Sequence, residues 1–315
     1  MVENAVPKVS VCMITYNHEP YIAQAIEGVL MQETDFPVEL VIGEDCSTDN
    51  TRKICEDYAK RFPDKIRLLS RSKNLGMSAN FLDTLENCNG EFIAFCDGDD
   101  YWTSPQKLQK QVDFLKDNPA YSLCYHRAKA IDEDGKHSPH LYQRKKVPTC
   151  FSDLLTLPGH HIPTASTVFR NEVPVEFPSP LKEYAIDIVV YLIIAGTGKF
   201  KCFEEEMSVY RVHSGNYTSS VNRIKQLNFV REAISKTRDH FSPFWRDEFE
   251  MYLSRLKADV AFVYYEQGEN ALFKSSYDEV MKYRRYLPFS TKRALFLRSL
   301  IVWLRFRKNV LSLHD

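Results

Sequence analysis

Short apolar runs alternate with segments of helical periodicity over roughly the first 126 residues. Each run has the length of a buried strand, and each intervening segment repeats its apolar residues every three or four positions, as amphipathic helices do. The predicted strands are Val9 to Ile14, Val38 to Ile42, Ile66 to Leu69, Phe92 to Cys96 and Tyr121 to Tyr125. The predicted helices are 21–31, 50–62, 78–87 and a segment that begins at Pro105. This alternation predicts an α/β fold with a mainly parallel sheet flanked by helices.

A purely helical pattern follows in the last part of the chain. Apolar spacing predicts helices around 224–241, 244–265 and 271–286. We therefore expect a domain over residues 1–220 and a helical C-terminal region over residues 221–315.

The end of that region is both basic and apolar. The chain has a net charge of −1, yet nine Lys and Arg residues and no acid lie between Lys282 and Lys308. Apolar residues fill many of the other positions, which predicts a basic amphipathic helix that contacts an anionic membrane surface. Arg298 and Arg305 leave no apolar run near the roughly 20 residues that a spanning helix needs. The alternative is a helix packed on its own domain, and no nucleic-acid-binding signature accompanies the basic stretch.

Composition indicates the compartment. The 315 residues are 44% hydrophobic, as in globular proteins, and the first residues lack the basic start and apolar stretch of a secretory signal. The eight cysteines form no Cys-x-x-Cys pair, and several lie in predicted strands, as reduced thiols do. We therefore expect a cytoplasmic protein, located at the inner face of the cell membrane if the basic helix binds there.

Three carboxylates follow the fourth predicted strand, in Asp97-Gly98-Asp99-Asp100. Carboxylates this close repel one another and lose solvation beside a core, so such a cluster favours a bound hard cation, Mg2+ or Mn2+. A solvated turn is the alternative. Further polar clusters follow the first and second strands, at Thr15-Tyr16-Asn17 and Glu44-Asp45-Cys46-Ser47. Because ligands bind at the carboxyl ends of parallel strands, we expect the three clusters to lie together.

Two other phosphate-binding motifs are absent from the sequence. No Gly-x-Gly-x-x-Gly follows the first strand, and Gly198-Lys199 lacks the earlier glycine of a P-loop. Dinucleotide and P-loop chemistry are therefore not expected.

Five motifs together resemble the family 2 nucleotide-sugar glycosyltransferases in their order and spacing. They are Val-Cys-Met-Ile-Thr-Tyr-Asn (11–17), Glu-Asp-Cys-Ser-Thr-Asp (44–49), Asn74-Leu75-Gly76, Gly-Glu-Phe-Ile-Ala (90–94) and Asp97-Gly98-Asp99-Asp100. The resemblance covers about residues 8–220. It implies an inverting enzyme of GT-A fold, with a nucleotide-binding half over about 8–126 and an acceptor side over about 127–220. Glu44 departs from the family's usual pair of aspartates.

The resemblance also assigns roles on the nucleotide side. Thr15, Tyr16 and Asn17 would line the base, and Asp45 would accept a hydrogen bond from N3 of uracil or thymine. Asn74 and Asn80 would be further nucleotide contacts, and Asp97 would face the ribose. In the segment from Tyr210 to Asn216, Arg211 would reach the diphosphate. Asp99 and His213 would hold a divalent metal, Mn2+ or Mg2+.

On the acceptor side, Asp187 is the predicted catalytic base, because the family places its base on an acid before an apolar helix in this segment. Glu183 is the fallback. Thr164 and Ser166 belong to a stretch that would shape the acceptor pocket. Trp102 would either stack on a sugar or pack beneath the loop.

These assignments predict a metal-dependent inverting transferase that moves a hexosyl or N-acetylhexosaminyl group. Its donor would be a nucleotide-diphosphate sugar, with a UDP-sugar favoured, and its acceptor a hydroxyl of a saccharide or lipid-linked molecule in bacterial surface polysaccharide synthesis. One alternative is a metal-dependent nucleotidyltransferase, although the glycine-rich basic loop of that class is missing near the N-terminus. The other is a non-catalytic protein that binds nucleotide-sugars or acts as a scaffold.

Overall fold

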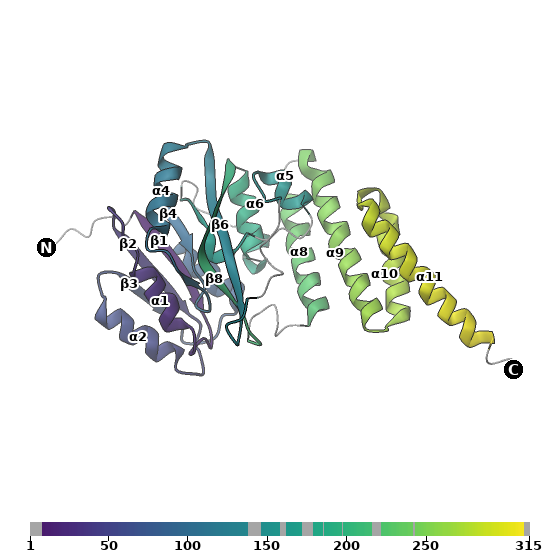
Figure 1. The fold of residues 1–315 in the computed structure, drawn as a ribbon, viewed down its shortest axis with the longest axis horizontal. Helices are drawn as coiled ribbons and strands as arrows, with labels where there is room; N and C mark the ends of the chain where they lie inside the picture. Colours follow the sequence, from purple (N-terminus) through teal and green to yellow (C-terminus); the bar gives the residue numbers. More distant parts are fainter. Residues whose placement is uncertain are drawn as a thin grey trace. The chain divides into compact units, whose positions relative to one another are not determined.

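The computed structural model describes residues 8–137, 146–157, 162–171, 179–184, 186–196, 198–215, 222–241 and 243–311. The chain forms two compact units, Met1–Ser214 and Gly215–Asp315 (Figure 1). The domain boundary predicted near residue 220 lies in 216–221, outside the described residues.

The first unit is built on one eight-stranded sheet in the order β3-β2-β1-β4-β7-β6-β8-β5. Its strands are β1 (Val9–Thr15), β2 (Val38–Glu44), β3 (Ile66–Ser70), β4 (Phe92–Phe95), β5 (Tyr101–Trp102), β6 (Tyr121–Asp132), β7 (Val168–Arg170) and β8 (Lys199–Val212). The pairs β1–β2, β1–β4, β2–β3 and β6–β8 are parallel. Strand β7 is antiparallel to β4 and β6, and β5 is antiparallel to β8. The predicted α/β class with a mainly parallel sheet is confirmed, whereas β5, β7 and β8 were not predicted.

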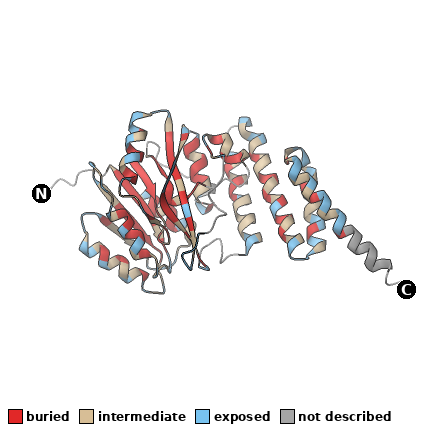
Figure 2. Cartoon of the chain, in the orientation of Figure 1, coloured by how far each residue is buried: buried red, intermediate tan, exposed pale blue. Residues whose placement is uncertain are grey.

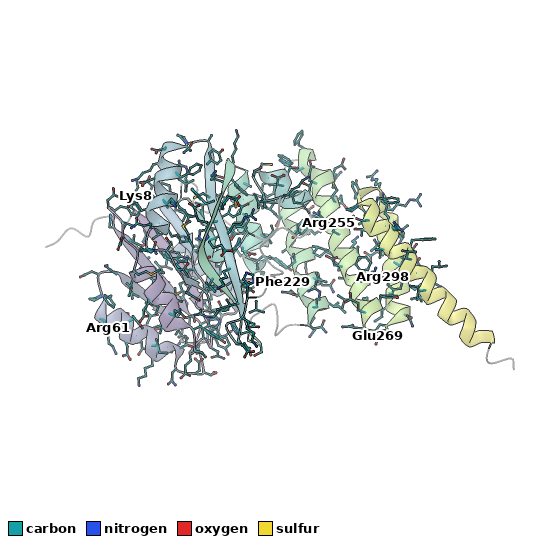
Figure 3. All side chains as sticks on the ribbon, viewed as in Figure 1. Lys8, Arg61, Phe229, Arg255, Glu269 and Arg298 are labelled. Atoms are coloured by element: carbon teal, nitrogen blue, oxygen red, sulfur yellow. The ribbon has the colours of Figure 1, made fainter. Side chains whose placement is uncertain are left out.

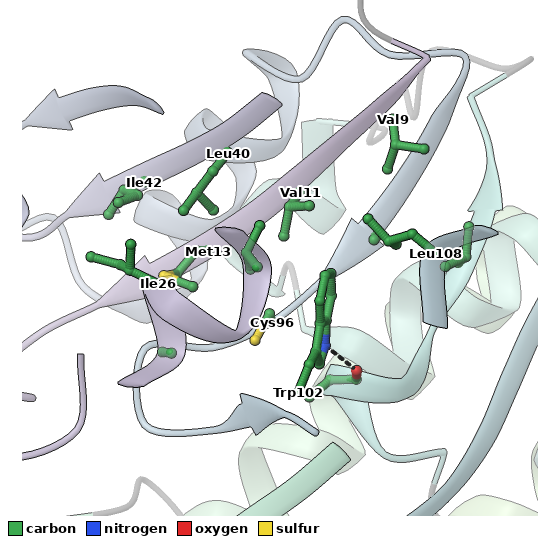
Figure 4. Packing of buried hydrophobic residues seen from close by; sticks show 14 of the residues in the cluster. Val9, Val11, Met13, Ile26, Leu40, Ile42, Cys96, Trp102 and Leu108 are labelled. Atoms are coloured by element: carbon green, nitrogen blue, oxygen red, sulfur yellow. Dashed lines mark hydrogen bonds between the residues drawn. The ribbon is translucent and has the colours of Figure 1, made fainter. Parts of the chain in front are cut away.

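Helices accompany this sheet, and Figure 2 shows the strands as the most buried part of the unit. The α-helices are α1 (Ile22–Leu30), α2 (Thr51–Arg61), α3 (Met77–Glu86), α4 (Lys107–Asp117), α5 (Phe151–Thr156) and α6 (Asp187–Ala195). Two short 3-10 helices are η1 (Thr164–Ser166) and η2 (Ser179–Tyr184). Val9, Val11 and Met13 alternate along β1 and pack in one core cluster with Ile26 of α1 and Leu108 of α4 (Figure 4). Burial of this apolar surface holds the carboxyl ends of β1, β2 and β4 in register.

The second unit consists of helices, as the sequence predicted. They are α8 (Arg223–His240), α9 (Arg246–Glu266), α10 (Asn270–Lys282) and α11 (Phe289–Leu311), with 3-10 turns at η3 (Pro243–Trp245) and η4 (Arg284–Tyr286). Its core cluster contains Ala258, Ala261, Phe273, Val280, Leu287, Leu295 and Val302. In the part of the chain that the structure describes, none of the helices has both the length and the apolar character needed to cross a membrane.

A lysine lies in the core of the first unit. Lys107 is 0% exposed, and its Nζ has no hydrogen-bond partner among the described residues. Its ammonium group lies 4.0 Å from the ring centroid of Trp102, whose indole N–H donates to the carbonyl of Ala165. Burial lowers the pKa of Lys107 from its ordinary value of 10.5 to about 7.

This lowered pKa predicts a pH-dependent stability. Between about pH 7 and pH 10.5 the unfolded chain holds the Lys107 proton more tightly than the folded chain, so the free energy of unfolding should rise with pH. We expect Lys107→Met to remove this rise when urea unfolding is measured across the range. Lys116→Met, on the exposed side of the same helix, should keep it. An unchanged pH dependence in Lys107→Met would contradict the prediction.

Candidate functional site

The three polar loops after β1, β2 and β4 lie together at the carboxyl edge of the sheet. The backbone N–H of Asn17 donates to Oγ of Ser47 over 3.0 Å, and Oδ1 of Asn17 accepts from the N–H of Thr48 over 2.8 Å. The N–H of Gly98 donates to the carbonyl of Ile14 over 3.0 Å. Hydrogen bonds thus join the loop after β1 to the loop after β2, and the end of β1 to the loop after β4.

Gly98 is required by the close passage of the acidic loop over β1. A Cβ at this position would lie 2.7 Å from Oγ1 of Thr15 and 3.0 Å from Cδ1 of Ile22. The glycine therefore allows Asp97 and Asp99 to flank the end of the first strand.

Asp45, the predicted base-binding residue, is 3% exposed and holds the loop that precedes α3. Its carboxylate accepts from the N–H of Leu75 over 2.7 Å and from the N–H of Gly76 over 3.0 Å. The side-chain amide of Asn74 donates to the Asp45 carbonyl over 3.1 Å. Asp45 and Asn74 are thus brought together, and their contacts to a nucleotide stay predictions.

Asn80 and Glu44 are buried beneath these loops. The Asn80 amide donates to the carbonyl of Gly43 over 2.9 Å, which ties α3 to β2. Glu44 accepts from the N–H of Ser47 over 2.6 Å and from Nε of Arg52 over 2.6 Å. The unusual acid at position 44 therefore closes its own loop. Tyr16 is 42% exposed beside these loops, as a side chain that stacks on a base would be.

Asp99 lies between two histidines. Its Oδ2 is 3.3 Å from Nε2 of His213 and 3.7 Å from Nε2 of His18. Burial alone would raise the pKa of Asp99, but His18 and the hydrogen bond from His213 outweigh it and lower the pKa. Burial lowers the pKa of His18, which favours a neutral imidazole. Sequence reasoning missed His18, although it directly follows the Thr15-Tyr16-Asn17 cluster.

The other two aspartates of the motif have different surroundings. Asp100 is 2% exposed, and its Oδ1 accepts from the backbone N–H of Arg211 over 3.1 Å. Burial, followed by the charges of Asp99 and Asp187, raises the pKa of Asp97 to about 8. The effect of Asp187 on Asp97 indicates that the predicted base and the predicted nucleotide contact face the same region.

The donor set fits a divalent cation that takes part of its coordination from a ligand. Asp99 would supply a carboxylate and His213 an imidazole, a pair that suits Mn2+. Among the described residues, no group of three or more His, Cys, Asp or Glu side chains is placed so that it could hold a metal ion by itself. Ions of this kind are commonly held by one or two protein groups together with substrate phosphates.

Arg211 fixes the position of the Asp99 loop. It is 8% exposed, and its Nη1 donates to the Asp99 carbonyl over 2.6 Å, while Nη2 donates to Gln24. Its guanidinium carbon lies 4.3 Å from the ring centroid of Tyr101 and 5.2 Å from that of Tyr21. The contact with a diphosphate stays a prediction.

Asp187 is the first residue of α6. Its Oδ1 accepts from the N–H of Ile188 over 2.7 Å, and its Oδ2 accepts from Oγ1 of Thr164 over 3.4 Å. One turn further, the buried hydroxyl of Tyr191 has its pKa raised by burial and then by the charge of Asp187. The sequence analysis did not single out Tyr191, whose spacing of four residues from Asp187 places both on one face of α6.

The other predicted acceptor residues have structural contacts. Ser166 is buried, and its Oγ donates to the carbonyl of Pro163 over 2.6 Å. Trp102 is 2% exposed and packs beneath the loop, the second of the two arrangements considered from the sequence (Figure 4). Glu183 is exposed in η2.

Two solved structures share this fold. Staphylococcus aureus TarS in complex with UDP-GlcNAc has a TM-score of 0.54 at 17% identity, covering 90% of this chain and 93% of that one. The mannosyltransferase PcManGT from Pyrobaculum calidifontis, in complex with GDP-Man and Mn2+, has a TM-score of 0.53 at 19% identity, covering 94% and 86%. The predicted GT-A type of fold is thereby confirmed.

Sequence relatives are found in bacteria. An uncharacterised protein of Mycobacterium tuberculosis strain H37Rv is 39% identical over 208 residues, which cover 65% of this chain and 59% of the relative. The Bacillus subtilis strain 168 glycosyltransferase TuaG, provisionally named for teichuronic acid biosynthesis, is 36% identical over 127 residues, 40% of this chain and 49% of TuaG. The matches span less than two thirds of either relative. Residues 10–172 match the family described as glycosyl transferase family 2. That match covers more than half of the 315 residues, and the chain belongs to this family.

Proposed function

We propose that the protein is a metal-dependent inverting glycosyltransferase. It would move a hexosyl or N-acetylhexosaminyl group from a nucleotide-diphosphate sugar, a UDP-sugar by preference, to a hydroxyl of a saccharide or lipid-linked acceptor. The observation that carries the proposal is the position of Asp99 between two histidines, on the acidic loop at the carboxyl edge of the sheet. UDP-GlcNAc bound to TarS, and GDP-Man and Mn2+ bound to PcManGT, support a nucleotide-sugar donor and a metal.

The reaction is a single displacement at the anomeric carbon. Asp187 takes the proton from the acceptor hydroxyl, and the acceptor oxygen attacks from the face opposite the diphosphate. The new C–O bond forms as the bond to the diphosphate oxygen breaks, so an α-linked donor yields a β-linkage. Asp99 and His213 would hold a divalent metal, whose positive charge would stabilise the leaving diphosphate. Thr164 orients Asp187 through its hydrogen bond to Oδ2.

We place this activity in bacterial surface polysaccharide synthesis, at the cytoplasmic face of the membrane. The provisional name of the relative TuaG supports that setting.

Metal-dependent donor binding tests the proposal. With Mn2+ and a donor at about 100 times its Kd, we expect the melting temperature to rise by roughly 5 °C, because the ligand binds only the folded state. A panel of UDP, dTDP, GDP and CMP sugars identifies the nucleotide. EDTA or Asp99→Asn should abolish the rise, and Asp57→Asn, exposed on α2, should retain it. A rise that is equal in EDTA would contradict the metal site.

Arg211→Lys tests the support of the Asp99 loop. A lysine cannot donate to the Asp99 carbonyl and Gln24 together, nor lie flat against Tyr101 and Tyr21. We expect Mn2+-dependent donor affinity to fall at least about 10-fold, the factor that corresponds to a loss of roughly 1.4 kcal/mol. Titration calorimetry with the donor checks this, and Arg231→Lys, remote in sequence on α8, serves as the control. Unchanged affinity would show that the loop holds its position without Arg211.

The variant Asp187→Asn tests whether Asp187 is needed for proton abstraction and not for donor binding. The amide can still accept from the N–H of Ile188, so the start of α6 should be retained, while proton abstraction is lost. We expect release of nucleoside diphosphate, measured with a cell-envelope extract as acceptor source, to fall by at least about 100-fold with donor binding preserved. Glu183→Gln should remain within a few-fold of wild type. The reverse pattern would transfer the role of base to Glu183, and donor binding without turnover in wild type would favour a non-catalytic role.

A further inference from the structure

Helix α11 carries apolar side chains on two different faces. Leu295 and Val302, seven residues apart, are 0% and 5% exposed and belong to the core cluster of the second unit. A second set is exposed: Phe289 (78%), Phe296 (59%), Leu297 (46%), Leu300 (41%) and Ile301 (40%). At 3.6 residues per turn, Phe289, Phe296 and Leu300 form one stripe, with Leu297 and Ile301 beside it. Packing within the chain therefore accounts for only one of the two apolar faces.

Exposed basic residues lie on α11 and directly before it. Arg293 is exposed on α11, and Lys282, Arg284 and Arg285 are exposed just before it. Arg298, labelled in Figure 3, packs inside the second unit instead, because its guanidinium carbon lies 4.6 Å from the ring centroid of Phe262 on α9. Between Lys282 and Lys308 the sequence contains nine basic residues and no acidic one. The exposed surface is thus apolar and positively charged at once.

We infer that this face of α11 binds an anionic lipid bilayer. Phe289, Phe296 and Leu300 enter the boundary between headgroups and acyl chains, and Arg293 and its neighbours contact lipid phosphates. A second copy of the chain fits the charge poorly, because two such helices would bring cations against cations with no acid between residues 282 and 308 to pair with them. A nucleic acid would match the charge but leave the exposed Phe and Leu side chains uncovered.

The inference deepens the proposed function by naming a partner for α11, and it rests on that proposal only for its biological purpose. A transferase that acts on a lipid-linked acceptor gains from being held at the surface where its acceptor lies. Lipid binding itself needs neither donor nor turnover, so it can be measured separately.

Vesicle flotation with the full chain tests the inference. We expect the protein to float with vesicles of phosphatidylcholine mixed with phosphatidylglycerol, and to remain unbound with phosphatidylcholine alone. The double variant Phe296→Ser, Leu300→Ser should lose at least about 10-fold in partitioning, because the inserted apolar area is removed. The triple variant Arg284→Gln, Arg285→Gln, Arg293→Gln should lose about 100-fold, at roughly five-fold for each cation.

A matched control distinguishes insertion of the α11 side chains from non-specific adsorption of exposed apolar residues to vesicles. Leu272 on α10 is 46% exposed, the same fraction as Leu297, and lies outside the basic stretch. Leu272→Ser should float like wild type. Retained circular dichroism and melting temperature would show that the α11 variants, which leave Leu295 and Val302 unchanged, still fold.

Several outcomes would overturn the inference. They are equal flotation with neutral vesicles, wild-type flotation of the Phe296→Ser, Leu300→Ser variant, or no flotation at all. A concentration-dependent dimer in sedimentation that this variant abolishes would show that the partner of α11 is a second copy of the chain. Tight DNA binding without vesicle binding would show that the partner is a nucleic acid. Metal-dependent donor binding, measured on the same variant, distinguishes a failure of the membrane inference from a failure of the proposed function. Failure of flotation with donor binding intact refutes the membrane contact alone, whereas flotation without donor binding refutes the transferase.

Discussion

The arrangement of the candidate site depends on the tie between Arg211 and the loop after β4. Three neighbouring carboxylates at a buried edge repel one another, so the loop needs fixed donors to keep its shape. Arg211 supplies them from the end of β8: its guanidinium donates to the Asp99 carbonyl, and its backbone N–H donates to the Asp100 carboxylate. Because β5 pairs with β8 directly after this loop, the sheet itself holds both partners in place.

The position of Arg211 on β8 also aligns His213, whose ring approaches the Asp99 carboxylate. His213 follows Arg211 by two residues, and extended backbone directs alternate residues to the same side. The ring of His213 also packs against Tyr21, with 4.5 Å between centroids, and Tyr21 lies below the Arg211 guanidinium. Asp99, Arg211 and His213 are therefore one packed group, and a change in any of them should disturb the other two.

Hydrophobic periodicity was sufficient to predict most of the helices and strands. Strands β1, β2, β3 and β4 and helices α1 to α4 follow apolar spacing, since each buries a regular face. Strands β5 and β7 have two and three residues, too few for any period to appear. Strand β8 has three consecutive glutamates, Glu204 to Glu206, in its exposed middle, and these interrupt its apolar pattern. Its existence depends on pairing with β6, which local sequence does not encode.

The site was predictable to the extent that its residues lie at strand ends. Asp97, Asp99 and Asp45 could be placed from strand order, because parallel strands bring their carboxyl ends to one edge. His18 directly follows the cluster after β1 and was still missed, since the sequence does not show which side chain of that loop approaches Asp99. The structural roles of Glu44 and Asn80 could not be predicted either, because the Ser47 N–H and the Gly43 carbonyl, which bond to them, are backbone groups that carry no sequence signal.

The antiparallel strand β7 connects the strands that carry the three polar loops with the later strands of the sheet. Inserted between β4 and β6, it places the later strands on the same sheet as the nucleotide loops. The turn η1 directly before β7 supplies Thr164, which donates to Asp187 on α6, and the charge of Asp187 reaches Asp97. Asp187 is thus positioned by a different set of contacts from those that position Asp99. In the proposed mechanism, donor binding and proton abstraction would therefore respond to different substitutions.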